Sequence, residues 1–145
     1  MKNWIKKLLM LFAAVIVAAI MFYQFVINKP HPDYETKKTD FALTAKDLYE
    51  QYAANKKTAE EKYNGKVLEI SGTFKSIEKN DSLAVVVFSF KEGMFGDEGI
   101  RCTFLPKFTA KVNGLNKNSV TRIKGFCSGF NDTDVIMEKC SLPVN

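Results

Sequence analysis

The chain has 145 residues, which is enough for one ordinary domain and an anchor but too few for two domains. Its hydrophobic content of 46% excludes a largely disordered protein. Of the net charge of +5, three units come from Lys2, Lys6 and Lys7, and from Asn28 onward 18 basic residues face 16 acidic ones. This balance argues against a nucleic-acid surface, which normally needs a concentrated basic stripe.

The N-terminal segment is predicted to be a membrane anchor. Residues 8–27 form an apolar run of 20 residues that Gln24 alone interrupts. At about 1.5 Å per residue, such a run spans roughly the 30 Å of a bilayer's hydrocarbon layer. A lone segment satisfies its backbone in lipid as a helix, so we expect a single transmembrane signal-anchor helix. A cleaved signal peptide is the alternative, because Val17-Ala18-Ala19 is a passable cleavage site.

The flanks of this run set its expected orientation. Three lysines precede the run and three follow it by residue 38, so the positive-inside rule is almost tied. Residues 1–7 are too short to hold a domain, so we expect them to be a cytoplasmic basic flank with the rest of the chain outside the cytoplasm. Lipid attachment to an N-terminal cysteine is not expected, because no cysteine precedes Cys102.

Residues 28–39 are predicted to be an extracytoplasmic stalk. Pro30 and Pro32 favour extended backbone, and few residues of this segment are apolar. His31, the single histidine of the chain, lies between them and is interpreted as a solvated residue rather than a ligand. A globular domain is expected over residues 40–145.

The domain is predicted to begin with helices. Thr44 and Asp47 resemble a capping box, with Asp in place of the usual Glu. Apolar residues then recur at helical spacing up to Tyr63, which predicts a helix and a second short helical turn over residues 58–62. We interpret this apolar stripe as a lid packed on a sheet.

Beyond these helices the period changes to that of β-strands. Gly72 lies inside the first strand and indicates a bulge or sharp bend, and residues 106–115 suit a helical connection. The five predicted strands cover residues 67–74, 83–90, 100–105, 119–129 and 135–140. The expected fold is therefore mainly β with N-terminal helices: a five-stranded OB-fold-like Greek-key barrel, preceded by a single transmembrane helix. A five-stranded sandwich is the alternative.

Two groups of residues carry a family resemblance. The first is Asn55-x3-Ala59-x3-Tyr63-x-Gly65-Lys66, followed by the strand glycine Gly72. The second is Cys102 with Phe104, then Gly125-x-Cys127-x-Gly129, then Cys140. Over residues 43–142 this ordered set resembles the bacterial tRNA_anti-like OB-fold domains. The resemblance implies an OB-fold in the bacterial envelope and leaves the function undefined. Together with the expected orientation of the anchor, it places the domain on the periplasmic side of the inner membrane.

Neither catalysis nor a metal site is expected. The domain has no histidine, so neither a Ser-His nor a Cys-His pair can be built. Asp132 and Asp134 flank a turn without the rest of a calcium loop. The three cysteines lack a CxxC pair, which argues against zinc. We therefore expect a non-enzymatic protein that needs no cofactor or metal.

The three cysteines are interpreted as structural or redox residues. In an OB topology the fifth strand lies between the third and fourth, so Cys102 and Cys140 form the candidate disulfide. Cys127 is then free, because it is offset from Cys140 by about three residues of 3.3 Å each, too far for a disulfide. Three reduced core cysteines are the alternative.

A ligand face is expected on the second and third strands of an OB-fold and the loops beside them. This rule selects Phe88, Phe90, Phe95 and Arg101, because aromatic rings stack on bases or sugars and arginine binds phosphate. Core packing is the alternative for Phe88 and Phe90. Acidic residues surround Phe95 and oppose anion binding there.

Three functions stay open at this stage. The first is a non-enzymatic binding or interaction module, anchored in membrane lipid by residues 8–27, whose partner is another envelope protein or a glycan. The second is a single-stranded nucleic-acid binder, which the charge balance and the expected location oppose. The third is a thiol-redox or envelope-stress role for the cysteines.

Overall fold

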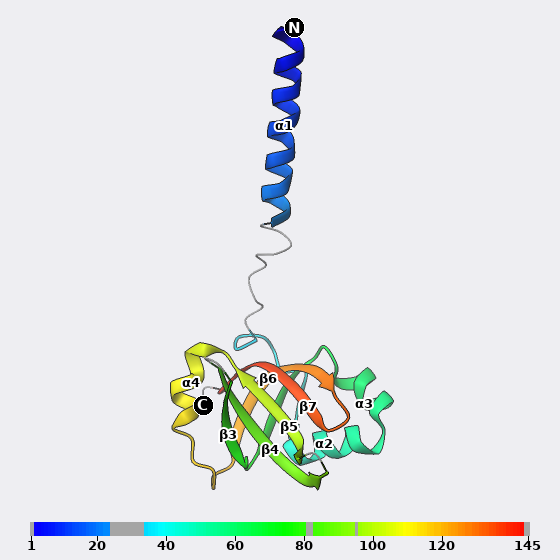
Figure 1. Cartoon of the computed structure of the whole chain (residues 1–145). Coiled ribbons are helices and arrows are strands. Elements are labelled where there is room, and N and C mark those ends of the chain that lie inside the picture. Colours follow the sequence, from blue (N-terminus) through cyan, green and yellow to red (C-terminus); the bar gives the residue numbers. More distant parts are fainter. Residues whose placement is uncertain (1, 24–33, 81–82, 95, 144–145) are drawn as a thin grey trace. The chain divides into compact units, whose positions relative to one another are not determined.

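The computed structural model describes residues 2–23, 34–80, 83–94 and 96–143 (Figure 1). The chain divides into two compact units, Met1–Pro32 and Asp33–Asn145. His31 and the last part of the predicted apolar run, residues 24–27, lie outside the described residues.

The first unit is the helix α1 (Lys2–Phe22). Its stretch from Trp4 to Phe22 has 19 residues with a mean hydropathy of 2.3, and the described side chains are exposed. By length and composition this helix is able to cross a membrane, and an N-terminal signal sequence shares those properties. The helical part of the anchor prediction is therefore confirmed, and membrane crossing stays a prediction.

The second unit is a curved sheet with helices packed on it (Figure 1). In chain order its elements are β1 (Phe41–Thr44), α2 (Ala45–Ala54), α3 (Lys56–Tyr63), β2 (Val67–Gly72), β3 (Ser76–Asn80), β4 (Leu83–Gly93), β5 (Gly96–Phe104), a 3-10 turn η2 (Pro106–Phe108), α4 (Thr109–Asn113), β6 (Thr121–Phe130) and β7 (Asp134–Ser141). The predicted helical connection after the third strand is confirmed as η2 and α4.

A side-chain hydrogen bond caps the N-terminus of each lid helix, α2 and α3. The Asp47 N–H donates to Thr44 Oγ1 at 3.1 Å, which confirms the predicted cap of α2. Asn55 caps α3 in the same way, accepting from the Thr58 N–H at 3.2 Å. Each bond satisfies a backbone donor that the first helical turn leaves free. The buried lid residues are Ala45, Leu48, Tyr49, Tyr52, Ala59 and Tyr63.

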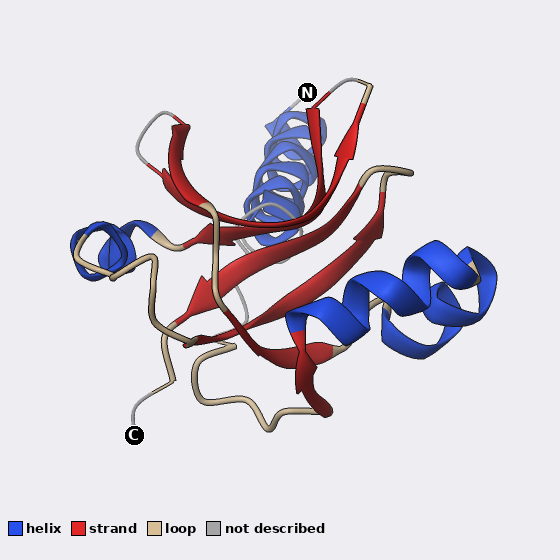
Figure 2. Ribbon diagram, turned by 90° about the horizontal axis from the view of Figure 1, so that it is seen from below, coloured by secondary structure: helices blue, strands red, loops and turns tan. Residues whose placement is uncertain are grey.

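The described strands form one open sheet in the order β1-β2-β6-β7-β5-β4-β3. The mainly β prediction is therefore confirmed, but the predicted five-stranded barrel is wrong in strand number, and the sheet does not close into a barrel. Sequence periodicity missed β1, which pairs parallel to β2, because four residues are too few to show alternation. The predicted first strand, residues 67–74, is shortened to β2, which pairs with β6, and it is followed by a further strand that was not predicted, β3, which pairs with β4. Figure 2 shows the strands curving around a common interior.

The division between β2 and β3 confirms the bend predicted at Gly72. A Cβ at this position would lie 3.3 Å from Ala45 Cβ and 3.4 Å from the Phe88 ring. The glycine therefore lets the helix and the sheet approach closely where the strand turns. Phe74 is buried directly after the bend, and the Lys75 N–H donates to the Val87 carbonyl at 2.8 Å.

Residues 34–39, expected in the stalk, pack on the second unit. The Tyr34 ring is buried and stacks on Phe126 with centroids 5.2 Å apart. Asp40 continues the attachment: its N–H donates to the Val67 carbonyl, and its Oδ2 accepts from the Val67 N–H, both at 2.8 Å. The chain is therefore attached to the domain from Tyr34 onward.

Candidate functional site

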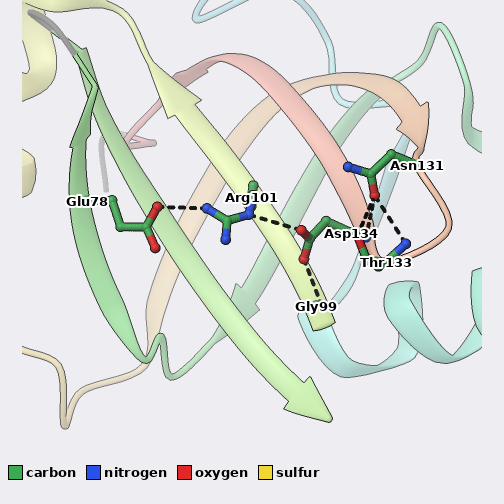
Figure 3. Close-up of polar contacts among 6 residues, drawn as sticks. All are labelled: Glu78, Gly99, Arg101, Asn131, Thr133 and Asp134. Atoms are coloured by element: carbon green, nitrogen blue, oxygen red, sulfur yellow. Dashed lines mark hydrogen bonds and ion pairs between the residues drawn. The ribbon is translucent and has the colours of Figure 1, made fainter. Parts of the chain in front are cut away.

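Arg101 lies on β5 between two carboxylates (Figure 3). Its Nε donates to Asp134 Oδ2 at 3.0 Å and its Nη1 to Glu78 Oε2 at 2.7 Å. Burial alone would lower the pKa of Arg101, but the hydrogen bonds to Glu78 and Asp134 raise it overall. The guanidinium therefore stays charged, and its charge is already matched within the domain.

Asp134 is held in place by the turn between β6 and β7. Its Oδ1 accepts from the Gly99 N–H at 3.0 Å, and its own N–H donates to Asn131 Oδ1 at 2.7 Å. Thr133 donates to the same Asn131 oxygen from its N–H and its hydroxyl, at 3.1 and 2.9 Å. Figure 3 shows these bonds joining the turn to β5. Asp134 therefore acts as a structural clamp, because both its oxygens are used.

Two other cations near this face, Lys75 and Lys91, also have carboxylate partners. Lys75 Nζ lies 2.6 Å from Asp97 Oδ2, and Lys91 Nζ lies 3.4 Å from Glu98 Oε2. Hydrogen bonding between Lys75 and Asp97 raises the pKa of the lysine and lowers that of the aspartate. Lys79 adds one further cation on β3.

A small depression beside Arg101 has a volume of about 140 Å³. Three of its lining residues are carboxylates and one is a guanidinium, so it disfavours anions. Its lining residues are Gly93, Met94, Gly96, Asp97, Glu98, Arg101, Thr133 and Asp134.

The structure does not bring the predicted ligand residues into one site. Phe88 is opposite Ile100 and Arg101 is opposite Val87, so strand alternation directs Phe88 and Arg101 to opposite faces of the sheet. Phe88 is fully buried and offers no surface to a ligand.

Of the two remaining phenylalanines, Phe90 is described by the structure and Phe95 is not. The half-buried Phe90 ring stacks on Tyr49 with centroids 5.5 Å apart. Phe95 lies outside the described residues. The proposed stacking platform therefore has no described, freely exposed ring.

A groove along β1 was not indicated by the sequence. β1 is an outer strand of the sheet and pairs with β2 alone. Two open pockets, of about 490 and 430 Å³, lie beside it and share Ala42, Leu43 and Asp47. The remaining lining residues are Phe41, Glu50, Gln51, Ala54, Lys62 and Tyr63 in the first pocket and Thr44, Glu69, Ile70, Ser71 and Arg122 in the second.

The cysteines are buried free thiols. Cys102 and Cys140 are hydrogen-bonded neighbours, and burial followed by this bond raises the pKa of Cys140 well above its usual value. Burial also raises the pKa of Cys127, against the opposing effect of its 3.3 Å contact with the Tyr52 hydroxyl. Thiols of this kind are poor nucleophiles. The disulfide between Cys102 and Cys140 stays a prediction.

Within the described ranges, no group of three or more His, Cys, Asp or Glu side chains is arranged to hold a metal ion.

Comparison with known proteins gives the family. The chain belongs to the tRNA_anti-like family, whose model matches residues 1–142 and so includes α1 as well as the domain. This confirms the resemblance found over residues 43–142 and extends it to the N-terminal helix. A search of curated proteins gave no match.

One solved structure supports the fold. It is a lipoprotein from Klebsiella pneumoniae subsp. pneumoniae, provisionally described as nucleic acid-binding. It is 17% identical, with a TM-score of 0.56, and the match covers 80% of this chain and 100% of that one. At this identity the likeness establishes a shared fold and leaves the binding properties of this chain open.

Proposed function

We propose that this chain is a non-enzymatic, membrane-tethered binding module of the bacterial envelope whose partner is a protein. The helix α1 serves as the tether, and the OB-fold domain lies on the periplasmic side of the inner membrane. The apolar helix, its inclusion in the family match and the lipoprotein among the similar structures support this proposal.

The pairing of Lys75, Lys91 and Arg101 with carboxylates, on and beside strands β3 to β5, is the observation that carries the proposal. This is the face on which OB-folds usually bind nucleic acid. Lys75, Lys91 and Arg101 all lie within 4 Å of carboxylates of the same domain. A phosphate backbone would have to displace these carboxylates, so the counterion release that drives nucleic-acid binding is largely lost.

A protein partner is better matched by the edge of β1. An outer strand presents unpaired backbone N–H and C=O groups, and an extended peptide can add to them as a further strand. The exposed Ala42 and Thr44 leave the approach to this edge unobstructed by large side chains. Phe41 and Leu43 line the groove and supply apolar contacts.

In-cell photocrosslinking tests this proposal directly. A photoreactive residue at Ala42 of the full-length chain should give a discrete protein adduct, and the same residue at exposed Lys117 should give none. A reporter that is active only outside the cytoplasm, fused to Asn145, should also be active. Equal adducts at both positions, or a silent reporter, would contradict the proposal.

Single-stranded nucleic-acid binding is the second candidate, favoured by the description of the similar lipoprotein. The test is the affinity of the full-length chain in nanodiscs for a labelled single-stranded oligonucleotide across a salt series. Tight binding with a steep salt dependence would support this candidate and refute the first. We expect weak binding with a shallow dependence.

A further inference from the structure

Tyr34 is the centre of a basic and aromatic cluster on the domain. Its ring stacks on Phe126, and the ammonium groups of Lys37 and Lys139 lie 5.2 and 5.6 Å from its centroid. We call Tyr34, Lys37, Phe126 and Lys139 the Tyr34 patch. The patch is supplied by residues 34–39, which we call the entering chain, and by strands β6 and β7. It therefore exists only in the folded domain.

Lys139 reaches this position through an unusual backbone conformation. Its φ is +52°, in the left-handed region that non-glycine residues seldom occupy. It lies where the register between β5 and β7 shifts, next to Cys140. Strained residues of this kind persist where the surrounding structure holds them and are concentrated at functional sites.

The entering chain is fixed beside the patch. Lys124 Nζ donates to the carbonyl oxygens of Glu35 and Lys37, and Glu35 also pairs with Lys107 at 2.6 Å. Ten residues, 24–33, separate the end of the described N-terminal helical segment from Tyr34. Even fully extended, at about 3.3–3.6 Å per residue, ten residues reach only roughly 35 Å. A helix anchored in a bilayer therefore keeps the Tyr34 patch within that distance of the lipid surface.

The lysines here differ from Lys75, Lys91 and Arg101, which pair with carboxylates. In the part of the chain that the structure describes, no ion pair joins Lys37, Lys38, Lys124 or Lys139 to a carboxylate. The acids nearest to these lysines in sequence are Asp33, Glu35, Asp40 and Glu138. Glu35 is held by Lys107, Asp40 accepts from the Val67 N–H, and Glu138 is exposed on β7. Positive charge is therefore in excess where the tether enters.

We infer that the Tyr34 patch binds the anionic headgroups of the membrane that holds the tether. This inference rests on the proposed function, because it needs α1 in the bilayer. Lysine side chains suit the membrane interface, because their stems are apolar and their tips are charged, and the buried Tyr34 ring holds Lys37 and Lys139 together. Anionic lipid attracts basic segments within a Debye length of the surface. Headgroup binding orients the domain on the membrane.

The test compares lysine reactivity on full-length protein in two kinds of nanodisc. One kind holds phosphatidylcholine alone, and the other holds phosphatidylcholine mixed with phosphatidylglycerol. Acetylation of each lysine is followed by mass spectrometry. In anionic discs at low salt, acetylation of Lys37 and Lys139 should slow by about threefold or more, and salt near 1 M, where the Debye length is about 3 Å, should remove the difference. Exposed Lys57 on α3 is the internal control and should react equally in both discs.

A double variant gives the second arm. Lys37→Gln with Lys139→Gln should abolish the slower acetylation of neighbouring Lys38 in anionic discs, and Lys57→Gln with Lys117→Gln should leave it intact. Equal acetylation rates in both discs, for a chain that has inserted, would overturn the inference alone. A chain that fails to insert through α1 would overturn the proposed tether and the inference together.

Discussion

Gly99 lies against the backbone of Phe88 so closely that no side chain fits between them. A Cβ at Gly99 would be 1.8 Å from the Phe88 carbonyl oxygen and 2.8 Å from its carbonyl carbon. Gly99 is opposite Ser89, beside the place where the register of β4 and β5 shifts. The Gly99 N–H meanwhile donates to the clamp residue Asp134. Gly99 therefore lies beside the register shift between β4 and β5 and is also hydrogen-bonded to Asp134, the residue that pairs with Arg101.

Replacing Gly99 by alanine should destabilise the domain strongly. The contacted atoms are backbone atoms, which cannot move aside as a flexible side chain would. We expect a loss of about 3 kcal/mol or more, at the upper end of overpacking effects. Gly114→Ala is the matched control, because a Cβ there meets its nearest atom, the Lys111 carbonyl oxygen, at an ordinary 3.5 Å. Urea unfolding followed by circular dichroism measures both, and a Gly99→Ala protein as stable as Gly114→Ala would contradict the geometry.

The clamp predicts that Asp134 matters more than Glu78 for stability. Asp134→Ala leaves the Gly99 N–H and one side of Arg101 without a partner in a buried setting, which should cost about 2–3 kcal/mol. Glu78 forms the more exposed ion pair, and Glu78→Ala should cost under about 1 kcal/mol. The urea midpoints of the two variants provide the measurement. The reverse order would mean that the ion pair, and not the clamp, stabilises the turn.

Tyr49 gives a pH dependence with a defined sign. Burial, and then its 2.9 Å hydrogen bond to Glu98, raise the pKa of Tyr49 from 10.0 to about 12. Below pH 10 the phenol is protonated in both the folded and unfolded states. Between about pH 10 and 12 the unfolded phenol loses its proton while the folded one keeps it, so the free energy of unfolding falls.

Tyr49→Phe tests this sign. Its free energy of unfolding should fall less steeply than that of the wild type across the same pH window, because the phenylalanine has no proton to lose. Urea titrations at several pH values give both slopes. Identical slopes would mean that Tyr49 ionises equally in the two states.

The buried thiols predict the pattern of alkylation. Native protein should give no adduct, because Cys102, Cys127 and Cys140 have no exposed area and burial raises the pKa of Cys127 and Cys140. Denatured protein without reductant should give three adducts. A single adduct, rising to three after reduction, would instead establish the disulfide between Cys102 and Cys140. Mass spectrometry of the intact chain distinguishes these outcomes.

Local signals in the sequence predicted much of this fold. Thr44 with Asp47 predicted the helix cap, Gly72 the bend, and strand alternation most of the ladder, because each depends on a few adjacent residues. No pattern in the sequence indicated β1, because its four residues form a strand by pairing with β2. The seven-stranded sheet follows from β1 and from β3, a five-residue strand after Gly72 that pairs with β4.

The candidate site was less predictable than the fold. Arg101 was selected as a phosphate-binding residue from its strand position. Its neutralisation depends on Asp134, which is 33 residues away and is brought close by the parallel pairing of β5 and β7. Tyr34 lies in the predicted stalk segment, and its partner Phe126 is too far along the chain for local sequence to indicate their contact. Contacts between residues far apart in the chain determine which charges are neutralised, and local sequence patterns do not predict such contacts.

Removing the carboxylates of Asp97 and Glu98 should leave Lys75 and Lys91 free to bind phosphate. In the double variant Asp97→Asn with Glu98→Gln, Lys75 and Lys91 lose their partners, and a phosphate backbone can then bind both. For single strands each released cation adds about 0.7 to the salt slope, so the slope of log affinity against log salt should steepen by about 1.4. The full-length variant is measured in nanodiscs by oligonucleotide anisotropy across a salt series.

The control for this last prediction carries the same change in net charge elsewhere. Glu50→Gln with Glu61→Gln removes two carboxylates from the helices of the lid and leaves the pairs of Lys75 and Lys91 intact. If both double variants steepen the slope equally, net charge alone governs binding, and local pairing is not what protects this face. If only the Asp97 and Glu98 variant responds, the carboxylates beside the strands exclude nucleic acid from a fold that often binds it.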